Sequence, residues 1–168
     1  AACSNVEAGG AIEVPCPPLG DPEAADPLGS FRPVSNLLEQ RCGTLDCHGQ
    51  EPRPLKIYGR IGLRAPDDSI EEPDSSEYYS GGELATTDYE VELNYRSTCG
   101  LEPEKLALVL TGELEVDDLT LIRKPKLFEK HKGGRVWDNG KPGDRCLKAW
   151  VVGAPVGEYV GLCPEELQ

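Results

Sequence analysis

The strongest constraint in this sequence is a short motif in which two cysteines, Cys42 and Cys47, are followed directly by His48. Two thiols with an adjacent imidazole form the pattern that attaches haem covalently, because each thiol adds to one vinyl group and the histidine ligates the iron. The usual gap between the thiols is two residues, and here it is four. The motif therefore predicts haem c, and a Cys42–Cys47 disulfide beside a surface histidine is the structural alternative.

A zinc site is a further alternative for the same residues. Zinc needs four ligands, and the motif together with His131 contains four side chains of the right kind. Their spacing matches no zinc module, however, and an oxidising compartment disfavours free thiolates. The chain contains two histidines, His48 and His131, and no methionine, the commonest second ligand of a cytochrome c iron.

The chain contains seven cysteines, a number that favours an exported protein in an oxidising compartment. They are Cys3, Cys16, Cys42, Cys47, Cys99, Cys146 and Cys163. With the motif committed to haem, the other five make two disulfides and leave one thiol. Sequence does not determine the connectivity. In one arrangement Cys99 pairs with Cys146 and ties the middle region to the final helix, and Cys16 pairs with Cys163 and ties the two arms together.

Cys3 would then be the odd cysteine. The preceding Ala1 and Ala2 resemble the end of a lipoprotein signal, whose cleavage leaves a lipidated cysteine. We therefore expect a periplasmic or extracellular protein. A lipid on Cys3 would anchor it to the outer membrane.

Apolar residues at helical spacing predict a mainly α fold with long loops. The expected helices cover 30–41, 86–98, 103–111 and 144–152, with a short helical turn within 117–130. Ser30 and Asp144 are the expected caps of the first and last helices, and Pro103 and Gly112 bound the third. Residues 86–98 also alternate as a strand would, but a capping box from Thr87 to Glu90 favours a helix.

Charge and motifs exclude several functions. A net charge of −13 argues against nucleic-acid binding and against docking on anionic lipid. No apolar run approaches the length of a transmembrane helix, and no hydrolase, P-loop or zinc-protease motif is present, so we expect no enzyme. Ten acids and no base lie between Asp67 and Glu92, which is either solvated surface, a weak calcium site or a docking patch for a basic partner.

Two stretches resemble the cytochrome-c-like domains of environmental bacteria, including those of myxobacterial exported proteins. They run from Phe31 to Gly49 and from Leu119 to Pro155, and the second contains L-x-x-K-P at 121–125, H-x-G-G at 131–134 and W-x-x-G-A-P at 150–155. The resemblance implies a class I cytochrome-c-like helical domain over 30–155, with an acidic insertion at about 65–100. Disulfide-stapled, irregular arms would flank it, an N-terminal arm at 1–29 and a C-terminal tail at 156–168.

The same resemblance implies the site. Cys42 and Cys47 become the thioether positions, His48 the proximal iron ligand and His131 the second axial ligand, in agreement with the absence of methionine. Arg41, Lys124 and Lys126 are candidate partners of the haem propionates, and Gly133 and Gly134 provide either a close approach to the porphyrin or a turn.

The expected function is therefore electron transfer by an exported monohaem c-type cytochrome. Two imidazole ligands leave no open iron position for a substrate and give a lower potential than a methionine ligand. The expected partner is another redox protein, a cytochrome among them, or a larger multi-subunit complex. The alternative is a haem-free, disulfide-stapled structural or interaction subunit on a cytochrome-like scaffold.

Overall fold

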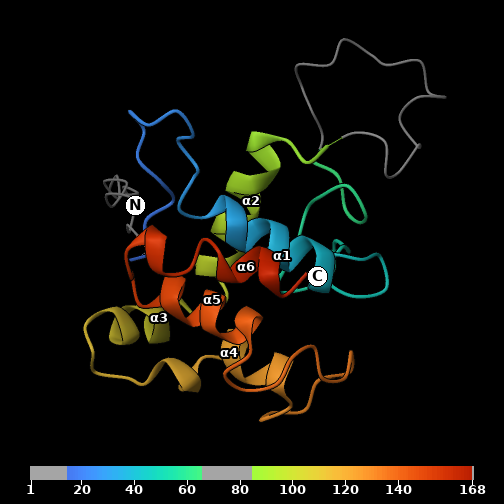
Figure 1. Ribbon diagram of the computed structural model, residues 1–168. Coiled ribbons are helices and arrows are strands. Elements are labelled where there is room, and N and C mark those ends of the chain that lie inside the picture. The colour runs from blue at the N-terminus through green and yellow to red at the C-terminus, as the bar shows by residue number, and fades with distance from the viewer. Residues whose placement is uncertain (1–14, 66–84, 168) are drawn as a thin grey trace, which may run out of the picture.

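The computed structural model describes residues 15–65 and 85–167 of the 168-residue chain. Within these ranges the fold is mainly α, as the sequence predicts, and long loops join the helices (Figure 1). The elements are α1 (Arg32–Cys42), α2 (Asp88–Cys99), α3 (Pro103–Leu110), η1 (Val116–Asp118), α4 (Thr120–Arg123), η2 (Lys124–Lys126), α5 (Pro142–Val151), η3 (Val156–Glu158) and α6 (Leu162–Glu165). None of the helices in the described ranges has the length and apolarity needed to span a membrane.

Helix α1 lies at the centre of the helical body, where it contacts α2, α5 and α6 (Figure 1). Val34, Leu37 and Leu38 are buried at helical spacing, so one face of α1 forms the core. Pro33 lies in the first turn as predicted, but the N-cap is Phe31, and no side chain caps the helix. The prediction of Ser30 as the cap was therefore wrong by one position, because Phe31 is drawn inward as a fully buried residue.

Helix α2 confirms the capping-box prediction and rules out the strand alternative for this segment. The Thr87 side chain accepts a hydrogen bond from the Glu90 backbone, and the Glu90 carboxylate accepts one from the Thr87 N–H. The buried Asn94 side chain bonds both the N–H and the carbonyl of Tyr58, and it also donates to Ser35 on α1. Helix α2 thereby fastens the loop after the cysteine motif to α1.

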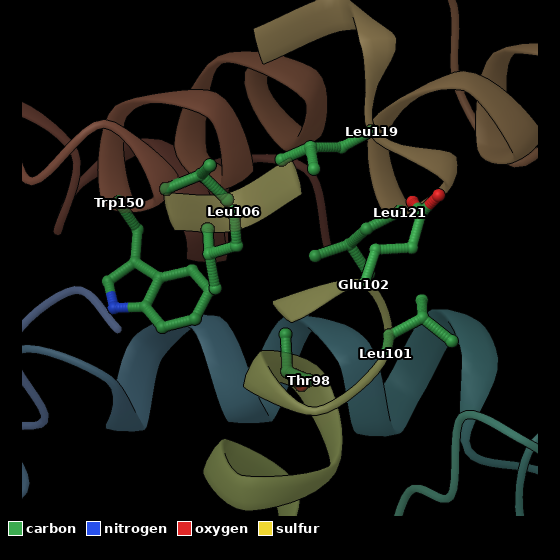
Figure 2. A pocket seen from close by; sticks show the side chains of 8 residues that line it. Thr98, Leu101, Glu102, Leu106, Leu119, Leu121 and Trp150 are labelled. Carbon is green, nitrogen blue, oxygen red and sulfur yellow. The ribbon is translucent and has the colours of Figure 1, made fainter. Parts of the chain in front are cut away.

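Helices α3, α4 and α5 meet around a small apolar cavity (Figure 2). Leu106, Leu119 and Leu121 surround it together with the indole of Trp150. Its volume is about 10 Å³, which leaves room for one water at most. The region where these three helices meet is thus a packed part of the core.

Helix α3 begins at Pro103 as predicted.

Helix α5 carries the apolar face that the sequence predicts. Cys146, Leu147 and Trp150 are buried, and the Trp150 ring centre lies 4.8 Å from that of Phe31. The predicted cap, Asp144, is not the N-cap, which is Lys141. Asp144 lies in the first turn instead, where it accepts a hydrogen bond from the Gly140 N–H at 2.7 Å.

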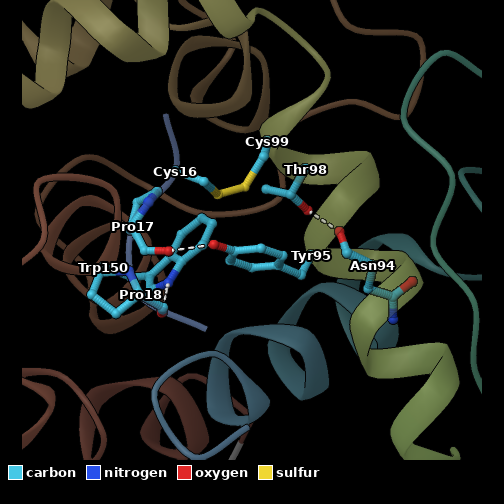
Figure 3. The surroundings of a disulfide bond; sticks show 8 residues. All are labelled: Cys16, Pro17, Pro18, Asn94, Tyr95, Thr98, Cys99 and Trp150. Atoms are coloured by element: carbon cyan, nitrogen blue, oxygen red, sulfur yellow. Dashed lines mark hydrogen bonds between the residues drawn. A yellow bond between two sulfur atoms is a disulfide. The ribbon is translucent and has the colours of Figure 1, made fainter. Parts of the chain in front are cut away.

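The disulfides join Cys16 to Cys99 and Cys146 to Cys163. The expected pairs Cys99–Cys146 and Cys16–Cys163 were therefore wrong. The extended segment that contains Cys16 runs beside α2, where the Tyr95 hydroxyl donates to the Pro17 carbonyl at 2.8 Å (Figure 3). Cys3 and most of the acidic run lie outside the described residues.

The C-terminal segment is more ordered than the tail expected from its glycines and prolines. Residues 156–167 contain η3 and α6, and α6 packs on α5 and α1. Tyr159 is buried and donates a hydrogen bond to the Ser30 carbonyl at 2.8 Å. Together with the fully buried Cys163, this contact ties the C-terminal segment to the start of α1.

The two disulfides differ in the loops that they close, which gives a test of their contributions. We expect Cys16→Ser/Cys99→Ser, across a separation of 83 residues, to lower the free energy of unfolding more than Cys146→Ser/Cys163→Ser, across 17 residues. The chain-entropy model gives about 4–5 kcal/mol for the first and about 3 kcal/mol for the second. Urea unfolding of both double variants measures this, and the reverse order would contradict it.

Candidate functional site

The end of α1, the loop after it and the segment around α4 enclose a cleft of about 110 Å³. Its lining residues are Leu38, Cys42, His48, Pro54, Leu55, Leu101, Thr120, Leu121, Lys124, Pro125 and His131. Three of the four predicted site residues, Cys42, His48 and His131, therefore share one cleft. The walls are mostly aliphatic, and both imidazoles are half-buried, so the cleft is an apolar space with two polar groups.

The cysteine motif forms a tight turn that closes on the end of α1. The His48 N–H donates to the Cys42 carbonyl at 2.9 Å, and the Cys47 N–H donates to the Thr44 carbonyl at 2.9 Å. Gly49 packs so closely on the Gly43 carbonyl that any side chain at position 49 would overlap it. The four-residue gap between the thiols is thus accommodated by a compact turn that sets Cys42 and His48 side by side.

The His48 ring is oriented by one hydrogen bond. Its Nδ1 lies 2.9 Å from the Leu55 carbonyl, so Nδ1 carries the proton and Nε2 keeps its lone pair. The His48 carbonyl accepts from the Ile57 N–H at 2.9 Å, which fixes the backbone as well. The pKa of His48 is lowered, mainly by burial, with smaller contributions from His131 and the cationic groups of Arg53 and Lys124, and the hydrogen bond to Leu55 acts in the opposite direction. These effects favour the neutral imidazole, the form that ligates metals.

The His131 ring is oriented in the same manner from a different part of the chain. Its Nδ1 lies 2.8 Å from the Gly134 carbonyl, which leaves its Nε2 with a free lone pair. Gly134 adopts a positive φ of 76° and donates its N–H to the His131 carbonyl, so this glycine makes a turn. Of the two roles considered for Gly134, the structure shows the turn.

The two imidazoles face the same space at a distance that can be tested against a metal site. A metal-bound imidazole nitrogen lies about 2.0 Å from the metal and about 1.2 Å from its own ring centre, so two imidazoles on opposite sides of one metal have ring centres about 6.4 Å apart. The ring centres of His48 and His131 are 6.2 Å apart, and their planes are inclined by 17°. The centre-to-centre spacing is therefore close to that of two imidazoles on one metal, and the two rings are stacked.

The cysteines divide into two groups. Four of the six described cysteines form disulfides, whereas Cys42 and Cys47 are free. Burial raises the pKa of the Cys42 thiol to about 12, with a further contribution from Cys47. The Cys42–Cys47 disulfide considered as an alternative is thus not formed here.

A buried lysine anchors the loop that carries His131. The Lys126 side chain is fully buried and forms an ion pair with Asp144 of α5 at 3.1 Å. Asp117 also pairs with Lys126 and with Lys148 of α5, and Asn139 accepts a hydrogen bond from Lys126 at 3.1 Å. The loop between η2 and α5 is therefore fixed at its start.

The neck of this loop is closed by a backbone contact. The Val136 N–H donates to the Pro125 carbonyl at 2.8 Å. Because Pro125 itself lines the cleft, the bond holds both ends of the loop next to the cleft wall. His131 thus lies on a loop whose ends are fixed and which contains no helix between η2 and α5.

The cations named from sequence have different environments. Lys124 lines the cleft. Lys126 is buried in its ion pair with Asp144, and Arg41 forms a hydrogen bond with the Glu166 carbonyl. The sequence also did not single out Arg53, which precedes the lining residue Pro54 and whose charge acts on His48. Its buried Nε has no hydrogen-bond partner among the residues that the structure describes. No local pattern distinguishes Arg53, because its importance comes from the folding of the loop against His48.

Other metal centres find no support in the described part of the chain. No three His, Cys, Asp or Glu side chains gather there as a metal site, which gives the four-ligand zinc alternative no support. A haem needs only two protein ligands, because the porphyrin supplies the other four. Comparison of the chain with models of protein families, with curated proteins and with solved structures finds no match.

The anchoring role of Lys126 gives a stability prediction. Lys126→Ala leaves the carboxylate of Asp144, which is 1% exposed, with Lys148 at 3.4 Å as its remaining ion-pair partner beside the hydrogen bond from the Gly140 N–H. Removing one partner of a buried ion pair costs about 3–5 kcal/mol, so we expect a loss of that size in urea unfolding. The exposed Lys130 on the same loop is the control, because Lys130→Ala should change stability by less than about 0.5 kcal/mol. Equal effects of both changes would contradict the anchor.

Proposed function

We propose that this protein is an exported monohaem c-type cytochrome that transfers electrons. One observation carries the proposal: His48 and His131 lie across one apolar cleft, nearly parallel, each with Nδ1 bonded to a carbonyl and Nε2 free. Such backbone bonds are the arrangement by which proteins fix the tautomer of a metal-ligating histidine. The free thiols of Cys42 and Cys47 beside this pair make covalent haem the cofactor that the residues fit best.

Each residue has a distinct role in this proposal. Cys42 and Cys47 hold the cofactor by thioether bonds, in which each S–H adds across a vinyl double bond and no oxidant is needed. His48 and His131 would hold the iron through their Nε2 atoms. A haem, when bound, supplies a one-electron iron couple. The protein holds the ligands, excludes water and sets the local charge.

The cleft environment favours electron transfer over catalysis. With both axial positions filled by imidazole, a substrate has no place to bind on the metal. Leu38, Leu55 and Leu121 line the cleft and limit the access of water, which keeps the reorganisation of solvent small when the charge changes. The unpaired Nε of Arg53 is a candidate partner for a propionate, in addition to Lys124.

The finer features belong to the same proposal. The buried α1 and α5, which contact each other, agree with a class I cytochrome-c-like domain. Two disulfides fit an oxidising compartment, so we place the protein in the periplasm or outside the cell, with an anchor through Cys3 as one possibility. Its partner would be another redox protein or a multi-subunit complex. The alternative is a haem-free structural subunit. The free thiols of Cys42 and Cys47 do not support it, because that alternative expects a disulfide between them.

The first prediction concerns the natively matured protein. We expect a low-spin c-type absorption spectrum, with sharp bands on reduction, and a mass that exceeds the chain by one haem even after denaturation. The covalent mass increase should disappear in Cys42→Ala/Cys47→Ala, whereas Cys146→Ser/Cys163→Ser should retain it. A colourless native protein with an unmodified mass would overturn the proposal and leave the structural subunit.

The second prediction concerns the axial ligand. His131→Ala should convert the oxidised protein from low-spin to high-spin and shift the reduction potential, because one strong-field ligand is lost. Added imidazole should restore the low-spin spectrum by occupying the space that the side chain leaves. Lys132→Ala, one residue further along the loop, is the control and should leave the spectrum unchanged. An unchanged spectrum of His131→Ala would show that another group ligates the iron.

A further inference from the structure

The segment from Arg123 to Arg135 has a charge opposite to that of the whole protein. It contains six Lys and Arg residues and one acid, Glu129, in a chain of net charge −13. The segment therefore has a net charge of +5, and the rest of the chain has a net charge of −18. Lys126 is neutralised by Asp117 and Asp144, so the charge that reaches the surface is smaller than this count. The other bases of the segment still reverse the local sign of the charge.

This basic segment borders the cleft. Lys124, Pro125 and His131 line the cleft, so the segment supplies one of its walls. Lys130, Lys132 and Arg135 are exposed. In Figure 1 the loop extends from α4 at the lower edge of the helical body, on the side opposite α2. Arg135 pairs with Asp138 at 2.8 Å, and Lys124 pairs with Glu129 at 3.5 Å. The positive charge displayed to solvent beside the proposed electron-transfer site is therefore chiefly that of Lys130 and Lys132.

The same loop displays two large apolar side chains. Leu127 and Phe128 are 43% and 58% exposed. Leu127 is the one non-glycine residue of the described ranges with a positive φ, 60°, which it adopts as the C-cap of η2 and which is uncommon for leucine. The Phe128 ring lies 4.8 Å from the buried Nζ of Lys126, which holds the ring in place. The loop therefore presents an exposed apolar pair on the same short segment as the exposed Lys130 and Lys132.

We propose that the segment 123–135 is the docking surface for an acidic face of a protein redox partner. An apolar centre with a charged rim is the usual composition of a protein interface, and complementary charge guides encounter and orientation. The acidic remainder of the molecule repels the same partner, so the partner approaches at the cleft. The inference rests on the proposed electron-transfer function. It reverses the expectation of a basic partner that the net charge alone suggests.

Poly-L-glutamate is a suitable probe, because a protein of net charge −13 should not bind it unless positive charge is gathered locally. We expect the full-length, natively matured protein to bind poly-L-glutamate at low ionic strength in calorimetric titration, with backbone amide NMR shifts confined to 123–135. Binding should weaken steeply with salt. Lys130→Glu/Lys132→Glu should weaken it at least tenfold.

The matched control is Arg60→Glu/Arg96→Glu, which changes the charge equally at two exposed bases outside the segment and should alter affinity less than twofold. Absence of binding, or equal weakening by both variants, would overturn the proposal. Vesicles of phosphatidylglycerol test a lipid surface instead, and their binding through 123–135 in preference to poly-L-glutamate would also overturn it. The titration needs no haem spectrum, so its failure is distinguishable from failure of the cytochrome proposal.

Discussion

The packing of α1 against α5, centred on the contact between Phe31 and Trp150, is the interaction on which the site depends. Helix α1 ends at Cys42, so its position determines where the motif and His48 lie. Helix α5 contains Asp144, which pairs with Lys126 and thereby fixes the start of the His131 loop. Two histidines that are 83 residues apart in sequence are thus held 6.2 Å apart between ring centres through one pair of helices.

Much of the helical structure follows from local signals, because caps and apolar spacing act over a few residues. The Thr87 capping box and the boundary at Pro103 are correct for this reason. The misassigned features depend on contacts distant in sequence. Cys16 pairs with Cys99 because the segment that contains Cys16 lies along α2. Asp144 forms an ion pair with the buried Lys126, and no local sequence pattern connects these two residues. Helix α6 was missed because it gains its stability from packing on α5 and α1.

The candidate site was predictable to a similar degree and for a related reason. Adjacent residues made the motif recognisable, and the family resemblance singled out His131, which the fold brings to the same cleft. The carbonyls that orient the two imidazoles belong to Leu55 and Gly134, and backbone acceptors leave no mark in a sequence. Arg53 was invisible for the same reason, since its unpaired nitrogen becomes significant only when the loop lies against His48.

The basic segment shows how one set of like charges serves two purposes. Lys126 is buried and neutralised by Asp117 and Asp144, so its charge adds stability to the loop and little field to the surface. Lys130 and Lys132, in contrast, are exposed to solvent. Because the anchor and the displayed charges lie on one short loop, the position of His131 and the position of the docking surface are fixed together. A partner that docks on this loop is therefore guided to the same side of the protein as His131.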